Sequence, residues 1–317
     1  MTSTRGASSA AGTARTPDET GAGTADTTAN TPRTGGAPGA APGYRPGRTL
    51  PLRVEAVRQL LRRRTLVAFA VVLLLPAVVW AAFAIGGTPH GRDNIPSLID
   101  VATSSGLNFA LAVLFVSSGF LLTLPVALFF GDTVASEAGW SSLRYLLAAP
   151  VPRARLLTSK ALVAFGFSAA AVLALPAVAL AVGTAAYGWG DLQLPAGGTL
   201  PAGTAALRFA AIAGYVFVSQ LAVAGLAFWL STVTDAPLGA VGGAVGMAIL
   251  SNILDAITAL GSLRNILPTH WQYAWADALQ PDLEWTGMVK GASVALSYAV
   301  VCAALAFRGF QRKDIVS

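Results

Sequence analysis

Six apolar runs, each long enough to cross a lipid bilayer, constrain this chain more than any other feature of its sequence. They cover about residues 66–85, 107–130, 161–187, 207–230, 238–257 and 287–307. A helix needs about 20 apolar residues to cross the hydrocarbon core. Only 11% of the 317 residues are charged, against roughly 25% in soluble domains, and the period-two alternation of a membrane β-barrel is missing. The sequence therefore predicts an all-α polytopic membrane protein with six transmembrane helices.

The lysines and arginines beside these runs predict the orientation of the chain. One face holds four of them, Arg92, Arg208, Arg264 and Lys290. The other face holds twelve: Arg53, Arg58, Arg62, Arg63, Arg64, Arg144, Arg153, Arg155, Lys160, Arg308, Arg312 and Lys313. Because cytoplasmic loops carry the excess of positive charge, both termini and residues 131–160 are expected on the cytoplasmic side of the cell membrane. We assign the net charge of +6 to this contact with the lipid bilayer and not to nucleic acid.

Residues outside the runs divide into a tail and parts of one membrane domain, 50–317. Residues 1–49 are rich in Thr, Ala, Gly and Pro and are expected to form a disordered cytoplasmic tail. Residues 52–64 predict a basic amphipathic interface helix, although a simple positive flank of the first span is an alternative. Its polar side includes Arg58, Arg62 and Arg63.

The sequence makes specific predictions for two further segments. Residues 258–285 are too polar and aromatic to span. Their Trp271, Tyr273, Trp275 and Trp285 are expected in an aromatic belt at the outer membrane interface. In the fifth run, Gly239, Gly242, Gly243 and Gly246 form two overlapping G-x-x-x-G spacings, which favour close helix packing within the bundle before contact with a second copy.

The sequence lacks the motifs that nucleotide binding, catalysis or metal binding would need. No glycine precedes any of its three lysines, so a phosphate loop of the Gly-Lys type is excluded. The single Cys302 predicts a buried thiol, and His90 and His270 have no metal-ligand spacing around them. We therefore expect no enzyme activity, no catalytic residue, no metal site and no cofactor in this chain.

The highest density of charge between two uncharged runs occurs in residues 131–160. Six of these thirty residues are charged, and Pro150 and Pro152 lie near the third span. Ser136 is expected to cap a helix that starts at Glu137, with Leu143, Leu146 and Leu147 on one side. Such a helix could transmit motion from a cytoplasmic partner into both flanking spans, or it could simply rest at the lipid headgroups.

The same stretch resembles the signature of ABC-2 type transporter permeases, the membrane subunits of ATP-driven exporters. That signature commonly reads Gly-Asp, then Glu, three residues, Gly-Thr-Leu-Arg-x-Leu-Leu, then Pro-Val-x-Arg and a Leu-Leu pair before Lys. The matching residues are Gly131-Asp132, Glu137, Leu143-Arg144, Leu146-Leu147, Pro150-Val151, Arg153, Leu156-Leu157 and Lys160. Ser141-Ser142 stand where Gly-Thr is usual. The resemblance covers about residues 50–317.

The resemblance implies a coupling loop, 131–160, that docks on a separate ABC ATPase subunit, which would hold ATP and Mg²⁺. It implies Glu137, Leu143, Arg144, Leu147 and Arg153 as coupling residues, and a second permease copy or paralogue as a dimer partner. We expect export of an amphipathic or lipid-like substrate. The alternative is a non-transporting membrane anchor or mechanotransmission subunit for a cytoplasmic ATPase. A secondary transporter is disfavoured, because ionisable residues avoid the middle of the spans.

Overall fold

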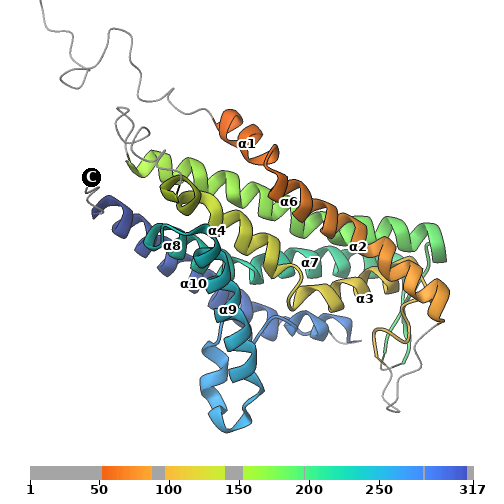
Figure 1. Cartoon of the computed structure of the whole chain (residues 1–317). Helices are drawn as coiled ribbons and strands as arrows, with labels where there is room; N and C mark the ends of the chain where they lie inside the picture. Colours follow the sequence, from red (N-terminus) through yellow and green to blue (C-terminus); the bar gives the residue numbers. More distant parts are fainter. Residues whose placement is uncertain (1–51, 88–96, 140–152, 196, 281–282, 313–317) are drawn as a thin grey trace, which may run out of the picture. The chain divides into compact units, whose positions relative to one another are not determined.

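α-Helices make up most of the chain that the computed structural model describes, namely residues 52–87, 97–139, 153–195, 197–280 and 283–312 (Figure 1). These residues lie within one compact unit. The predicted tail, 1–49, and the coupling residues Leu143, Arg144 and Leu147 lie outside the described residues. The helices are α1 (Leu52–Leu60), α2 (Arg63–Gly86), α3 (Gly106–Ser118), α4 (Thr123–Gly139), α6 (Arg153–Tyr187), α7 (Ala202–Ser219), α8 (Leu221–Val233), α9 (Pro237–Ala256), η2 (Thr258–Ile266), η3 (Ala274–Leu279) and α10 (Thr286–Arg312).

Within the described residues, five stretches are helical, long and apolar enough to cross a membrane. They are α2, α6, α7 together with α8, α9 and α10. The pair α3 and α4, bent by 50° between its halves, makes a sixth if it counts as one span. The six predicted runs fall on these six candidates, which confirms the all-α polytopic class.

Several described helix ends gather at one end of the bundle. The group that we call the basic end comprises residues 52–64, 132–136, 153–160 and 308–312. Ion pairs join Arg62 to Asp132 and Lys160 to Glu55, and Arg153 Nη1 donates to the Gln311 carbonyl oxygen at 3.3 Å. The opposite ends of the helices carry residues 104–108, 188–200 and 258–280, which we call the far end. The described segments that the sequence assigned to the basic face therefore lie together.

A short hairpin and one hydrogen-bonded asparagine organise part of the far end. Strands β1 (Leu192–Gln193) and β2 (Thr199–Leu200) pair antiparallel. The buried Asn108 donates from Nδ2 to the Gln193 carbonyl oxygen at 2.8 Å, and its Oδ1 accepts from the Gln193 N–H at 3.0 Å. These two bonds fix the hairpin to the first turn of α3.

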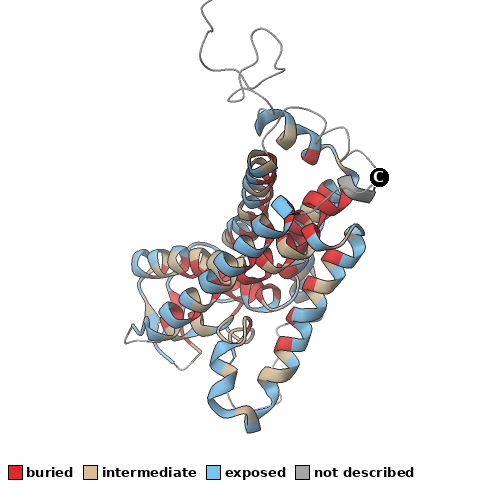
Figure 2. Ribbon diagram, turned by 90° about the vertical axis from the view of Figure 1, so that its left-hand side faces the viewer, coloured by how far each residue is buried: buried red, intermediate tan, exposed pale blue. Residues whose placement is uncertain are grey.

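Helices α4 and α8 occupy the centre of the bundle, where buried residues concentrate (Figure 2). Phe129 of α4 packs against Phe69 of α2 and Phe167 of α6, with ring centroids 5.7 and 5.8 Å away. On the other side, Phe228 of α8 lies 6.1 Å from both Phe130 and Phe307. Two aromatic clusters thus join α2, α4 and α6, and α4, α8 and α10.

The second predicted span is not one continuous helix, which corrects the expectation for 107–130. The helix stops at Ser118, resumes at Thr123 and continues to Gly139. Pro125 explains the break, because proline has no N–H for the carbonyl of residue 121 and its ring would clash with that carbonyl. Pro125 instead occupies the first turn of α4, where its missing N–H would have no helical partner.

The fourth predicted span consists of α7 and α8, which meet at Gln220 with the backbone still close to helical (φ −70°, ψ −14°), and this junction is bonded to the break between α3 and α4. Gln220 Nε2 donates to the Ser118 carbonyl oxygen at 3.1 Å, and Thr123 Oγ1 donates to Gln220 Oε1 at 3.4 Å. Gln220 is buried. Backbone that leaves the helical pattern at membrane depth is tolerated only where protein covers it and satisfies its polar groups, and Gln220 does so here.

The aromatic segment at the far end is partly core, which corrects its assignment to an interfacial belt. Trp275 is fully buried and packs edge-on against Phe115 of α3, with centroids 6.4 Å apart. A Cβ at position 119 would clash with the Tyr273 hydroxyl, so a larger residue at Gly119 would require the tip of that side chain to move. Trp285 and Tyr273 remain exposed. The segment therefore packs into the bend between α3 and α4.

Candidate functional site

The predicted coupling stretch is held between two helices that the structure describes. Helix α4 runs through Glu137 to Gly139, and α6 begins at Arg153. Of Glu137 only the backbone is described. Ser136 does not cap a new helix, because α4 continues past it and its Oγ donates to the Asp132 carbonyl oxygen at 2.6 Å. Both ends of the stretch are thus helical extensions of membrane-length elements.

The end of α4 is tied to the start of α2 by a shared carboxylate. Asp132 accepts from Arg62 Nη1 at 2.6 Å and from Arg64 Nη1 at 3.1 Å. Arg62 Nη1 also donates to Ser136 Oγ at 3.3 Å. The Asp132 side chain is only 9% exposed, so its charge needs these partners to offset the loss of water.

The start of α6 is tied to α1 by a second, more buried ion pair. Lys160 Nζ lies 3.0 Å from Glu55 Oε1, and the two side chains are 3% and 12% exposed. Arg58 lies on the other carboxylate oxygen of Glu55 at 3.9 Å. An ammonium group buried to this degree is stable only when it is paired. Glu55 therefore fixes where α1 lies against α6.

A glycine explains how closely α4 approaches α9 beside this network. A Cβ at Gly131 would come within 2.8 Å of Val241 Cγ2 and 3.1 Å of the Val241 backbone nitrogen. The neighbouring backbone cannot give way as a side-chain tip could, so a larger residue would push the helices apart. Gly131 and Asp132, adjacent in sequence, thus contact α9 and α2 respectively.

The predicted interface helix is shorter than expected. It ends at Leu60 instead of Arg64, since Arg62 adopts extended backbone angles (φ −70°, ψ 129°) and α2 begins at Arg63. This turn brings Arg62 to Asp132. The apolar side chains Val54 and Val57 are more than half exposed, whereas Gln59 is buried. The apolar side of α1 therefore points away from the bundle.

Only part of the glycine pattern in α9 packs inside the bundle. A Cβ at Gly243 would lie 3.0 Å from Leu230 Cδ1, and one at Gly239 would meet only the adjoining turn at Thr234. Positions Gly242 and Gly246 are exposed, with no atom within 4 Å of an added Cβ. The small residues that α9 buries are Ala240, Ala244, Ala248 and Ser251.

Sequence reasoning selected Arg58, Arg62, Arg63 and Arg153 at this end, but it did not pair Arg58 with Glu55 or Arg62 with Asp132. Glu55 is the one acidic residue of α1, and Asp132 is the first charge after the second apolar run. Isolated acids among arginines at the end of a span were the available signal. Among the described residues, no group of three or more His, Cys, Asp or Glu could hold a metal ion.

Two comparisons with known proteins bear on this chain. A family model described as a protein of unknown function, DUF2705, matches residues 65–316. A search of curated proteins finds no match. The matched range includes all six candidate spans except the first two residues of α2, and α1 lies outside it.

Proposed function

The chain belongs to the DUF2705 family, whose description assigns no activity, and we propose that it is the membrane-spanning permease subunit of an ABC exporter. A separate ATPase subunit, with ATP and Mg²⁺, would drive it from the basic end. The resemblance of residues 131–160 to the ABC-2 signature is the sequence basis of this proposal. The pair of ion-paired connections at the two ends of that signature is the observation that carries it.

Those connections would let the described ends of α4 and α6 act together as a lever. Asp132 links the end of α4 to Arg62 and Arg64 at the start of α2, and Lys160 links the start of α6 to Glu55 in α1. A push on the segment between α4 and α6 would therefore reach four helices together. A helix resting passively at the headgroups would not need buried ion pairs at both ends, since such pairs carry a desolvation cost.

The length of α6 supports the same role. Its 35 residues span about 52 Å at 1.5 Å per residue, roughly 20 Å more than the hydrocarbon core of a bilayer. The surplus can extend Arg153–Lys160 beyond the core as a rigid helical stem. Arg153, the first residue of this stem, donates to the Gln311 carbonyl oxygen, which couples the stem to the end of α10.

The bend between α3 and α4 is where movement of α4 would be transmitted to other helices. Gln220 receives a hydrogen bond from the Thr123 hydroxyl, which also lies 3.5 Å from the Gly119 carbonyl oxygen, and donates one to the Ser118 carbonyl oxygen. Movement of α4 would therefore be passed to the joint between α7 and α8. An amphipathic or lipid-like substrate is proposed because the candidate spans expose large apolar side chains, among them Val67, Leu124 and Ile249.

The experiment is reconstitution of the tagged full chain, co-expressed with phosphate-loop ATPases from its own genome, in lipid vesicles. ATP hydrolysis and export of a fluorescent lipid are measured together. Glu137→Ala or Arg144→Ala should leave insertion and ATP hydrolysis intact and abolish most of the export. Arg308→Ala, at the same end but on α10, is the matched control and should export normally.

A charge exchange tests the connection itself. Glu55→Lys or Lys160→Glu alone should lower ATP-dependent export, and the double variant should restore part of it because the pair reforms with opposite polarity. Unchanged export in Glu137→Ala and Arg144→Ala would contradict the proposal. Export by the chain without any ATPase would also contradict it, and hydrolysis without export would favour the membrane-anchor alternative.

A further inference from the structure

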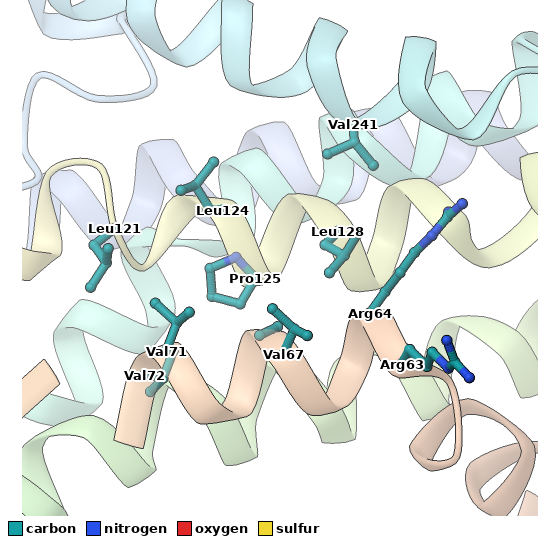
Figure 3. Close-up of a pocket in the computed structure, with 11 residues that line it drawn as sticks. Arg63, Arg64, Val67, Val71, Val72, Leu121, Leu124, Pro125, Leu128 and Val241 are labelled. Atoms are coloured by element: carbon teal, nitrogen blue, oxygen red, sulfur yellow. The ribbon is translucent and has the colours of Figure 1, made fainter. Parts of the chain in front are cut away.

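An apolar groove runs along the outside of the bundle between α2, α4 and α9 (Figure 3). Its volume is about 500 Å³. Val67 and Val71 of α2 form one wall, and Leu124 and Leu128 of α4 form the other. Val67 is 61% exposed and Val71 is 49% exposed, so the groove is open along its length. It exists because α2 packs its opposite side on α6 through Phe69 and Phe167.

One end of this groove is cationic. Arg63 and Arg64 both line it there, at the basic end, as Figure 3 shows. The Arg64 side chain is 64% exposed while it bonds Asp132 through Nη1, which leaves other N–H donors of its guanidinium group for a further acceptor. Within the described part of the chain, Arg63 is exposed and forms none of the observed ion pairs or hydrogen bonds.

The charges at this end are unbalanced. Arg62, Arg63 and Arg64 bring three positive charges, and Asp132 is their one described acidic partner, so these four residues carry a net charge of +2. Arginine guanidinium groups bind phosphate with two parallel hydrogen bonds. A basic cluster directly beside a transmembrane helix also attracts anionic lipid headgroups.

We propose that this groove binds one anionic phospholipid, with its phosphate on Arg63 and Arg64 and one acyl chain along α2 and α4. From Arg63 to Val72, α2 rises about 14 Å at 1.5 Å per residue. That is close to half of the roughly 30 Å hydrocarbon core, the depth of one leaflet. Charge at one end and apolar walls over one leaflet match the two parts of a phospholipid.

This inference does not rest on the proposed export function, because a lipid in this groove would contact α2 and α4 whether or not the chain moves a substrate. A bound chain would cover Val67, Val71 and Leu124, which the protein itself leaves exposed. It would also bridge α2 to α4 beside the Asp132 ion pairs.

The headgroup is tested by native mass spectrometry of the full chain, purified in detergent and titrated with phosphatidylglycerol or with phosphatidylcholine of the same acyl chains. Phosphatidylglycerol should bind about tenfold more tightly than phosphatidylcholine, since one hydrogen-bonded charge contributes about this factor. Arg63→Gln should remove that preference. Arg308→Gln, an equal loss of charge at the same end on α10, should preserve it.

The acyl chain is tested by filling the groove. Val67→Trp places a large ring where the chain would lie and should lower the binding of both lipids about tenfold. Val78→Trp is the matched control, since Val78 lies on the same helix, is also 61% exposed and does not line the groove. It should bind both lipids as the unaltered protein does. Both variants change exposed positions, so folding is expected to be preserved.

Three outcomes would overturn the proposal. The first is equal loss of phosphatidylglycerol in Arg63→Gln and Arg308→Gln, which would mean that overall charge attracts the lipid. The second is equal binding by Val67→Trp and Val78→Trp. The third is a dimer in the same spectra that retains no lipid and dissociates in Val67→Trp, which would assign the groove to a second copy of the chain.

Discussion

Helix α2 and the paired helices α7 and α8 are both long enough to cross a membrane, yet they differ sharply in burial. In an apolar stretch of 18 residues within α2, 11% of the residues are buried, whereas 56% are buried in the corresponding stretch of Ala202–Val233. Among the five unbent candidate spans of the described residues, α2 is the most apolar and the least buried. In this chain, greater hydrophobicity therefore does not mean a position nearer the core.

This difference in burial follows from the surroundings of each helix, which are lipid for α2 and other helices for α7 and α8. Lipid tails are as apolar as leucine, so a helix such as α2 gains little by moving its apolar side chains from lipid into protein. The central helices are held instead by close packing and by polar side chains that find partners. Gln220 bonds Ser118 and Thr123, and Ser231 lies within hydrogen-bond distance of Thr133.

The largest expected effect separates two glycines. Gly225→Val should destabilise the bundle by about 3 kcal/mol, because its Cβ would lie 2.7 Å from the Ala299 Cα of α10. Gly242→Val, on the open side of α9, should change the free energy of unfolding by less than about 0.5 kcal/mol. Unfolding by SDS in mixed micelles measures both, and equal losses would break the distinction between centre and periphery.

A smaller effect is expected from truncating apolar side chains. Ile212→Ala in α7 removes a side chain that is fully buried and should cost about 2 kcal/mol through the cavity that it leaves. Val78→Ala in α2 removes one that is 61% exposed and should cost less than about 0.5 kcal/mol, since lipid fills the space. The same SDS titration compares them. A loss at Val78 as large as that at Ile212 would place α2 inside an interface.

The polar joint between the broken helices should contribute about 1 kcal/mol. Gln220→Leu keeps the volume of the side chain but leaves the Ser118 carbonyl oxygen without its donor. Ser293→Ala in α10 is the control, because the exposed Ser293 bonds only Val289 of its own helix. We expect the control to unfold with an unchanged free energy. If Gln220→Leu did the same, the joint would not hold the junction of α7 and α8 to the bend between α3 and α4.

The smallest effect concerns the attachment of α2 to the centre. Arg62→Gln should cost about 0.5–1 kcal/mol, because Arg62 is partly exposed and Arg64 still pairs with Asp132. The loss should shrink when the unfolding is repeated at high salt, which screens exposed charges. Arg308→Gln should show neither effect. A loss independent of salt would point to packing instead of charge.

The sequence predicted the elements of this fold better than their joints. Apolar run length located all six candidate spans, and charge bias correctly grouped the segments of the basic end. The sequence did not predict the break at 119–122. Pro125 was a signal for it, but a proline in a span can either kink a helix or begin one. The bend at 119–122 is held in part by Gln220, which comes from another helix.

The same holds for the candidate site, where the sequence indicated the segments but not the contacts between them. The sequence identified residues 131–160 and the arginines of 58–64, since charge beside an apolar run is visible without a structure. It could not pair Glu55 with Lys160, which are 105 positions apart, because that contact depends on how α1 lies against α6. Among the α9 glycines it could not separate Gly243, which faces the bundle, from Gly242, which faces outward.

The amino-acid sequence alone determined that this chain forms membrane-length helices and which segments share one end. Both follow from the cost of placing polar backbone and charge in hydrocarbon, which acts on each segment separately. Only the tertiary structure decided which helices are central, which faces meet lipid, and which acids hold which arginines. Helices that are apolar on every side carry no local signal for their neighbours, so packing fit and a few buried polar contacts make that choice.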